Sequence, residues 1–269
     1  MKLAISTDTY DDIWNQISSQ MFYIPSHFTA DPGVSDDIID SNSTMTGVPA
    51  VNIEGTLTNT GANEGWFTGI AAGDTRGFSN DSAFLDFFRT DTLAVGQSII
   101  FSFHIFVPAA GATAESGLIT YGRGVASQPG MMIVLTSGGK ITSNYNDGSA
   151  TLLRTVGITS VNTDAVNHVL TEYRRISETE FYIGSYLNGD LDLTASDTIG
   201  SLTSITGGLN VYSRQDNSGN IVAPLEADFR MSDIIVARTD GNKSSMIAEL
   251  AARQSRVRTS LVRGWGDVL

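Results

Sequence analysis

The sequence predicts an all-β protein, a two-sheet antiparallel jelly-roll sandwich followed by a C-terminal α-helix. Three observations lead to this fold class. Runs of β-branched and aromatic residues recur along the chain, glycine- and asparagine-rich turns separate them, and no long helical pattern stands between them. A parallel βαβ architecture needs such intervening helices, so the sequence excludes it.

The segment 166–193 carries the clearest strand signal. Phe181, Ile183 and the pair Tyr186–Leu187 place apolar side chains close to every second position, which is the strand period. Asn188–Gly189 then supplies the two residues with positive φ that a type I′ turn requires. We therefore expect a hairpin with Asn188–Gly189 at its tip.

Other runs predict the remaining strands. Ser98–Val107 is long, β-branched and aromatic, and Phe229–Arg238 leads directly into a helical pattern. Gly138–Gly139 and Asp147–Gly148 are typical of further hairpin turns. The strands that we expect lie at residues 48–57, 65–70, 83–89, 97–107, 117–123, 130–137, 140–146, 149–157, 166–176, 180–188, 208–214 and 225–238.

The order of these elements resembles the laminin-G-like, concanavalin A-like lectin sandwich, over about residues 20–255. The resemblance implies the fold but no single function, because this sandwich serves lectins, adhesins, enzymes and structural coats alike. The residues that carry it are Phe101, Phe103 and Pro108 in the long strand, His168, Val169 and Tyr173 in the next, and Tyr186, Asn188 and Gly189 at the hairpin.

The chain of 269 residues contains no linker-like segment, so we expect one domain. We divide it into an N-terminal arm (1–20), the sandwich (21–240), and a C-terminal helix and tail (241–269). Tyr10–Phe22 has the spacing of a short amphipathic helix, and an arm packed over the sandwich explains the same residues equally well.

Composition excludes several chemistries. The chain has no cysteine, which rules out disulfides, thiol nucleophiles and cysteine–metal sites. We expect no signal peptide and no membrane span, since no apolar run approaches the roughly 18 residues that a span needs. Residues 1–237 carry a net charge of −16 and residues 238–269 carry +3. The acidic body should repel nucleic acid and anionic membranes, so we expect neither as a partner.

The C-terminal segment 241–263 predicts a helix that Asn242 or Ser244 caps and Gly264 ends. Two interpretations stay open. The helix covers its own sandwich and its basic face is merely solvated, or the basic face is an assembly anchor for an acidic surface. One side of the helix is apolar (Met246, Ile247, Leu250, Ala251, Val257, Leu261), and the opposite side is basic (Arg253, Arg256, Arg263).

Catalysis finds no support in the sequence. Hydrolases with this sandwich carry a strand motif E-x-D-x-x-E, which places three carboxylates on one face. The closest match is Glu226-Ala227-Asp228, and the third acidic position is occupied by Met231. His27, His104 and His168 share no metal-ligand spacing. We interpret His104 as a core or sheet-face histidine with a hydrogen-bond partner and His168 as a structural residue. We expect no enzymatic activity and no cofactor.

Candidate ligand sites rest on residue type. Aromatic side chains stack on sugar rings, although they also fill cores, and the candidates are Trp66, Tyr121, Tyr145 and Tyr212. The resemblance also implies a structural Ca²⁺ at the sandwich rim, and ordinary Asx turns explain the same residues. The calcium candidates are Asn144, Asn146 and Asp147, or Asp190 and Asp192.

The acidic, cysteine-free chain with its C-terminal helix resembles the capsid-decoration and tail-associated proteins of bacterial viruses. Such proteins are made in the host cytoplasm and need no signal peptide. We therefore expect a non-enzymatic virion structural protein. Its partners would be other virion proteins or further copies of itself, with host-surface glycans as an additional ligand. The alternatives are an extracellular carbohydrate-binding module or adhesin and, third, a polysaccharide-degrading enzyme.

Overall fold

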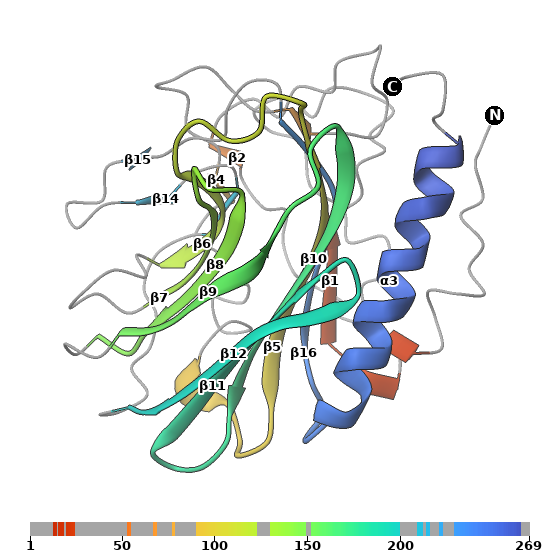
Figure 1. Ribbon diagram of the computed structural model, residues 1–269. Coiled ribbons are helices and arrows are strands. Elements are labelled where there is room, and N and C mark those ends of the chain that lie inside the picture. The colour runs from red at the N-terminus through yellow and green to blue at the C-terminus, as the bar shows by residue number, and fades with distance from the viewer. Residues whose placement is uncertain are drawn as a thin grey trace.

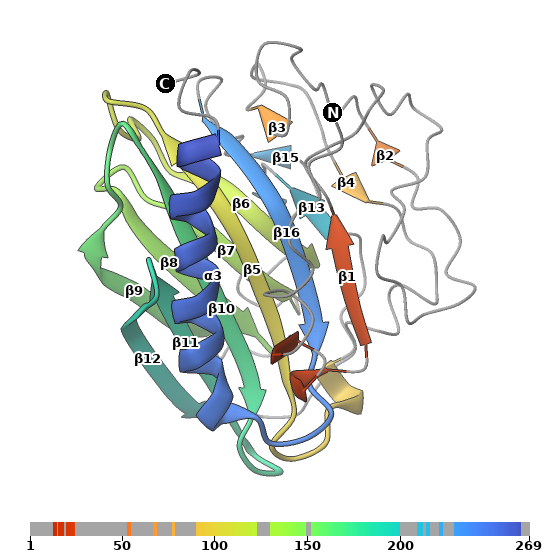
Figure 2. The ribbon, with the colours of Figure 1, turned by 90° about the vertical axis from the view of Figure 1, so that its right-hand side faces the viewer.

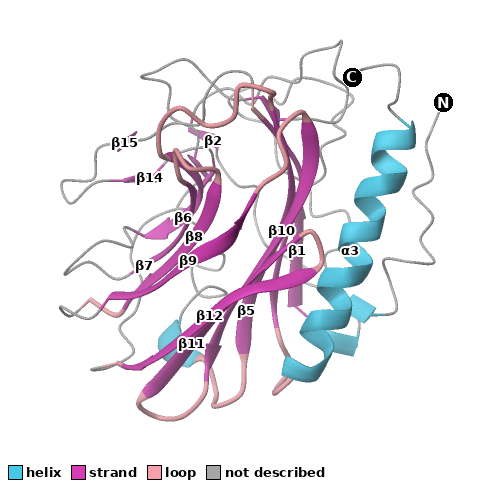
Figure 3. Cartoon of the chain, in the orientation of Figure 1, coloured by secondary structure: helices cyan, strands magenta, loops and turns pink. Residues whose placement is uncertain are grey.

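The computed structural model describes residues 13–14, 16–18, 20–24, 53–54, 67–68, 77–78, 90–122, 130–148, 152–199, 209–211, 214–215, 221–222 and 229–264. Two antiparallel sheets face each other as a sandwich, and the helix α3 (Ser244–Gly264) lies against the outer side of one of them (Figure 1). Strands make up most of the described chain (Figure 3). The predicted all-β sandwich with a C-terminal helix is therefore confirmed.

Every strand pairing in the two sheets is antiparallel. Sheet A has the order β1 (Gln20–Ile24), β16 (Arg230–Arg238), β5 (Ser98–Val107), β10 (Ala165–Arg175), β11 (Glu180–Leu187) and β12 (Asp190–Thr198), and β3 (Phe67–Thr68) also pairs with β16. Sheet B has the order β2 (Ile53–Glu54), β4 (Gly77–Phe78), β13 (Leu209–Val211), β6 (Ser116–Gly122), β7 (Gly130–Leu135), β8 (Lys140–Asn146) and β9 (Leu152–Ser160). Outside both sheets are the pair β14 (Arg214–Gln215) and β15 (Ile221–Val222) and the short 3₁₀ helix η1 (Thr90–Thr92).

Aromatic side chains fill the space between the sheets. Tyr145 of sheet B stacks on Phe181 of sheet A with ring centroids 4.0 Å apart, and Phe101 meets Tyr173 edge to face at 5.9 Å. The Tyr173 hydroxyl crosses the core and donates to the Met132 carbonyl at 3.1 Å. A buried tyrosine needs such a partner, so this bond both satisfies the hydroxyl and joins the two sheets.

The outer face of sheet A is buried by helices. Ile247, Leu250 and Ala251 of α3 pack with Ile100 and Leu170 of the sheet in a second core. Figure 2 shows α3 lying lengthwise in front of β5 and β10. A strand that is covered on both faces is buried at successive positions, as β5 is from Ser98 to Ile105, where only Ser98, Ser102 and His104 are polar. The helical residues Ile13, Trp14 and Ile17 belong to the same outer core.

The predicted hairpin turn also fixes the helix. Asn188 and Gly189 have φ values of 55° and 96°, as the type I′ prediction requires. Asn188 accepts a hydrogen bond from the His168 amide at 3.0 Å, and its carbonyl accepts one from the Ser255 hydroxyl of α3 at 2.7 Å. The turn therefore joins β10, the β11–β12 hairpin and α3.

Two strands differ from the sequence prediction. Tyr10–Phe22 was expected as a helix or an arm, but the chain is already extended at Gln20, and β1 pairs with β16 from Gln20 opposite Arg238. Strand β12 was not predicted because its composition is polar, and it is mostly exposed at the edge of sheet A. The strand predicted at 83–89 lies outside the described residues. The three-part division at residues 20 and 240 stays a prediction.

Replacement of Gly189 by alanine should destabilise the protein by about 1–3 kcal/mol. The backbone there has positive φ, and an added Cβ would lie 3.0 Å from the Cβ of Ser255 and 3.3 Å from the Cα of Ala252. Gly138→Ala is the matched control, because the closest atom, Thr136 Oγ1, is 3.8 Å away. Urea unfolding measures both changes, and equal losses at the two positions would contradict this role for the turn.

Candidate functional site

Polar side chains gather on both outer faces of the sandwich, and both groups contain buried polar atoms without a hydrogen-bond partner. One group lies on sheet A beneath α3. The other lies along β8 of sheet B. In the first group Trp14 Nε1 and Gln254 Oε1 are among the unpartnered atoms, whereas in the second group three alternate residues of one strand each carry such an atom.

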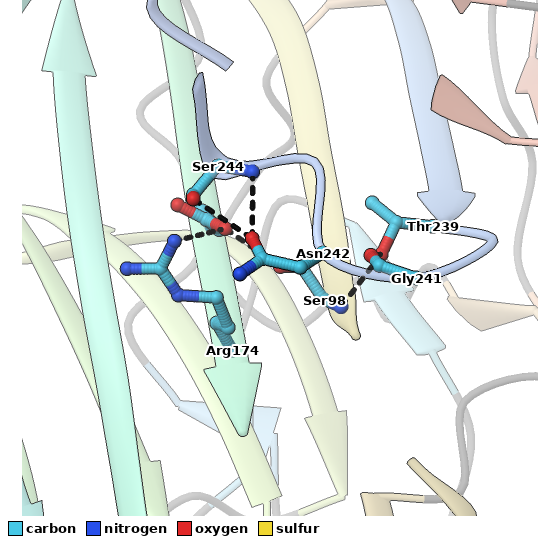
Figure 4. Close-up of polar contacts among 7 residues, drawn as sticks. Ser98, Arg174, Thr239, Gly241, Asn242 and Ser244 are labelled. Carbon is cyan, nitrogen blue, oxygen red and sulfur yellow. Dashed lines mark hydrogen bonds and ion pairs between the residues drawn. The ribbon is translucent and has the colours of Figure 1, made fainter. Parts of the chain in front are cut away.

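Near the start of α3 a buried carboxylate lies on sheet A and is held by neighbouring strands. Glu172 of β10 is 1% exposed and accepts a hydrogen bond from the Ser98 hydroxyl at 2.6 Å. Arg174 lies 3.7 Å from the same carboxylate oxygen, and its guanidinium stacks over the Tyr182 ring at 4.3 Å. Figure 4 shows Arg174 and Ser98 beside the loop that leads into α3. The charge of Glu172 is therefore compensated within the sheet.

The same view shows how that loop is held (Figure 4). The Ser98 amide donates to the Thr239 hydroxyl at 2.8 Å, and this hydroxyl donates to the Gly241 carbonyl at 2.8 Å. The Asn242 side chain accepts hydrogen bonds from both the amide and the hydroxyl of Ser244, at 3.2 and 2.8 Å. Asn242 thus caps the helix start, as predicted.

Burial governs the electrostatics of this cluster. It raises the pKa of the Glu172 carboxyl above its ordinary value, and Arg174 and the Ser98 hydroxyl oppose that rise. It also raises the pKa of Tyr182, with a further contribution from the Glu172 charge. Within the described residues no second carboxylate contributes to the shift of Glu172. The cluster therefore lacks the paired carboxylates that glycoside hydrolysis requires.

A histidine pair lies farther along the same helix. His104 and His168 face each other across β5 and β10, with ring centroids 5.1 Å apart. His168 Nε2 is 2.9 Å from the Ser102 hydroxyl, and His104 Nε2 donates to the Gln254 carbonyl of α3 at 3.3 Å. Both rings are buried. The prediction that His104 is a sheet-face histidine with a hydrogen-bond partner is confirmed.

Strand β8 presents a polar ladder on the outer face of sheet B. Ile141 and Tyr145 point into the core, so the alternating positions Thr142, Asn144 and Asn146 face outward. These three side chains are 0%, 5% and 0% exposed. Thr142 Oγ1, Asn144 Oδ1 and Asn146 Nδ2 have no hydrogen-bond partner. We call these three side chains the β8 ladder.

The neighbouring strands close the ladder on one side and open it on the other. On β7, Met132 and Val134 are opposite Asn144 and Thr142 and are 4% and 1% exposed. On β9, Arg154 is opposite Asn144 and is exposed, while Val156 is opposite Thr142 and is 42% exposed. Ile158, two positions farther along β9, is 68% exposed. The exposed side chains beside the ladder are therefore those of β9, whereas the ladder itself is buried.

The β8 ladder offers hydrogen-bond donors and acceptors that suit a neutral polar ligand. Its unpartnered atoms comprise a hydroxyl, an amide oxygen and an amide nitrogen, so donors and acceptors are both present. Buried polar atoms without a partner are rare in folded proteins and call for a specific explanation. The alternation of residue types along 141–146 predicts which side chains of β8 face outward. Whether those side chains find hydrogen-bond partners depends on β7 and β9, so the sequence of β8 alone does not predict it.

The aromatic sites predicted from the sequence are not brought together. Tyr121 and Tyr145 are 0% and 1% exposed and belong to the core between the sheets, so their prediction as exposed sugar platforms is wrong. Alternation along each strand turns both rings inward. Trp66 and Tyr212 lie outside the described residues.

The predicted calcium ligands fall into two separate groups. Asn144 and Asp147 lie at the end of β8, where Asn146 forms an Asx turn by accepting from the Gly148 amide at 2.7 Å. Asp190 and Asp192 belong to β12, and Asp192 accepts from the Thr159 amide at 2.8 Å. Thr159 is five residues from Arg154, the partner of Asn144, which is roughly 17 Å along a strand. Within the described chain no three His, Asp or Glu residues could hold a metal together. Calcium binding stays a prediction.

The comparison with the hydrolase motif turns on Met231. The Met231 side chain is fully buried in the core between the sheets, so the third position of the motif is not part of an accessible surface. The side chains of Glu226 and Asp228 lie outside the described residues.

The basic face predicted on α3 is only partly described. Arg253 forms an ion pair with Glu249 of the same helix, and Arg256 is exposed. The side chain of Arg263 lies outside the described residues, as do those of Val257 and Leu261. The apolar residues Ile247, Leu250 and Ala251 cover the helix's own sheet. This half of the helix fits the covering role, and the assembly anchor stays a prediction.

Comparisons with known proteins show the fold. No protein-family model matches the chain, and no curated protein matches it. The binding domain of botulinum neurotoxin serotype D matches with a TM-score of 0.57 at 13% identity, over 90% of this chain and 53% of that one. The receptor-binding domain of the mosaic serotype C/D neurotoxin gives 0.55 at 14% identity, over 88% and 51%. The binding domain of Paraclostridial Mosquitocidal Protein 1 gives 0.52 at 12% identity, over 89% and 52%.

This chain therefore shares a β-sandwich fold with these binding domains and spans about half of their length. Among the described residues, no helix combines the length and the apolar character that crossing a membrane would demand.

Glu172→Gln should remove a pH-dependent component of stability. Because the folded-state pKa of Glu172 is raised, its contribution is fully present below the unfolded value of 4.5 and is lost as pH rises through the folded value. The glutamine variant should therefore gain stability relative to the natural protein as pH increases. Urea unfolding from about pH 4 to about pH 8 measures this difference. Glu178→Gln, at a side chain that is 81% exposed, is the control. A difference that does not change with pH would contradict the assignment.

Proposed function

We propose that this chain is a non-catalytic carbohydrate-binding domain whose binding surface is the outer face of sheet B around the β8 ladder. The single observation that supports it is the run of three alternate residues on one strand, Thr142, Asn144 and Asn146, that each carry one of the ten unpartnered buried polar atoms among the described residues. Sugar hydroxyls both donate and accept, so one ligand of this class can satisfy all three atoms.

The geometry suits an extended ligand. Thr142 and Asn146 are four residues apart on one face of a strand, which places their Cα atoms about 13 Å apart. Val156 and Ile158 add exposed aliphatic surface on the open side. Such side chains pack against the C–H groups of a sugar ring, while the ladder forms hydrogen bonds with the sugar hydroxyls. Binding sites of this kind combine apolar contact with a few placed polar groups.

The matched structures agree with a binding role at a coarse level, because their titles describe binding and receptor-binding domains. Because their sequence identity to this chain is low, the similarity supports a shared fold and no specific function. The virion role that we inferred from the sequence rests on charge, composition and the C-terminal helix. It stays a prediction, and it is compatible with glycan binding by the same domain.

Thr142→Val tests the proposal with little change of shape. The substitution removes a hydroxyl that has no partner, so stability should be unchanged or slightly higher. Affinity for a bound polysaccharide should fall about tenfold, which corresponds to one lost hydrogen bond of about 1.4 kcal/mol. Calorimetric titration of a panel of soluble polysaccharides measures the affinity, and urea unfolding measures the stability.

Thr155→Val is the matched control, because its hydroxyl faces inward and donates to the Ser143 carbonyl at 3.3 Å. This variant should lose up to about 1 kcal/mol of stability and bind as the natural protein does. The proposal fails if no polysaccharide of the panel binds. It also fails if a polysaccharide binds equally well to the Thr142→Val protein.

A further inference from the structure

The strands that carry the β8 ladder have an unusual charge. The chain as a whole contains 29 acidic and 16 basic residues. Strands β6, β7, β8 and β9 nevertheless contain no aspartate or glutamate, and their charged residues are Lys140 and Arg154. This part of sheet B is therefore positive within an acidic protein.

Both cations lie on the outer face beside the ladder. Arg154 is directly opposite Asn144 and is exposed. Lys140 shares the face of Thr142 by strand alternation and is half-buried. Neither side chain forms a hydrogen bond or an ion pair with any residue that the structure describes. Their charges are available to a ligand.

Two described acidic residues near these strands, Asp192 and Asp147, do not neutralise the face. Asp192 reaches β9 from β12, but its carboxylate lies where a Cβ on Gly157 would point, on the inward side of the strand. Asp147 follows β8 and is buried. At physiological ionic strength the Debye length is about 8 Å, so acidic groups farther than this from the face are largely screened.

We propose that the ligand of this surface is an anionic oligosaccharide, one that carries carboxylate or sulfate groups. The inference rests on the proposed carbohydrate binding and specifies its ligand class. Arg154 would bind the anionic group through its planar guanidinium, which matches the two oxygens of a carboxylate or sulfate. Asn144 lies opposite and would bind a hydroxyl of the same sugar. Lys140, four residues before Asn144 and about 13 Å away along β8, would meet a second anionic group on a neighbouring unit.

Titrations with three oligosaccharides of equal length test this inference. One is an oligouronate, one is its carboxyl-reduced neutral counterpart, and one is a sulfated neutral oligosaccharide. The natural protein should bind at least one anionic form about tenfold more tightly than the neutral form. The two anionic arms show whether carboxylate or sulfate is the preferred group.

The variants Arg154→Gln and Lys140→Gln should each weaken anionic binding about three- to tenfold and reduce its dependence on salt. Arg256→Gln, at an exposed arginine of α3, is the control and should change neither. Equal binding of the neutral and anionic forms would overturn the inference, as would an Arg154→Gln protein with unchanged affinity. If neutral binding then still depends on Thr142, carbohydrate binding stands and only the anionic preference fails. Absence of binding in all three arms overturns both.

Discussion

The double-sided burial of sheet A is the constraint on which the other features depend. Its inner face packs against sheet B, and its outer face packs against α3 and the helical residues near Trp14. The helix is placed on the sheet by the Asn188–Gly189 turn at one point and by the loop at Asn242 at another. Glu172 and the histidine pair are therefore interior groups, and the hydrogen bond from His104 to the Gln254 carbonyl joins the sheet to the helix.

This burial decides which surface is left for a ligand. The polar groups on the outer side of sheet A, including the unpartnered atoms Trp14 Nε1 and Gln254 Oε1, are buried beneath helices, whereas the β8 ladder lies beside an exposed strand. Sheet B also opens to solvent along β9, where Arg154 and Ile158 are exposed. Both outer faces contain unpartnered polar atoms, so the proposed binding face follows from α3 covering sheet A and not from hydrogen-bond satisfaction.

Strand periodicity and turn chemistry were sufficient to predict most of the fold. Asn188–Gly189 was predicted as a type I′ turn because positive φ is a local requirement that sequence expresses directly. The candidate site was harder to predict from the sequence than the fold. The burial of Tyr121 and Tyr145 depends on which strand face meets the opposite sheet, and the ladder's missing partners depend on β7 and β9. Strand β12 was missed because an exposed edge strand carries few apolar residues.

The central claim is that sheet B, and not the helix-covered sheet A, meets the ligand. Amide hydrogen exchange with and without a saturating anionic oligosaccharide measures this directly. The account predicts that the ligand slows exchange in β8 and β9 and leaves β5, β10 and α3 unchanged. Slower exchange confined to α3 and β10, with β8 and β9 unaffected, would contradict it.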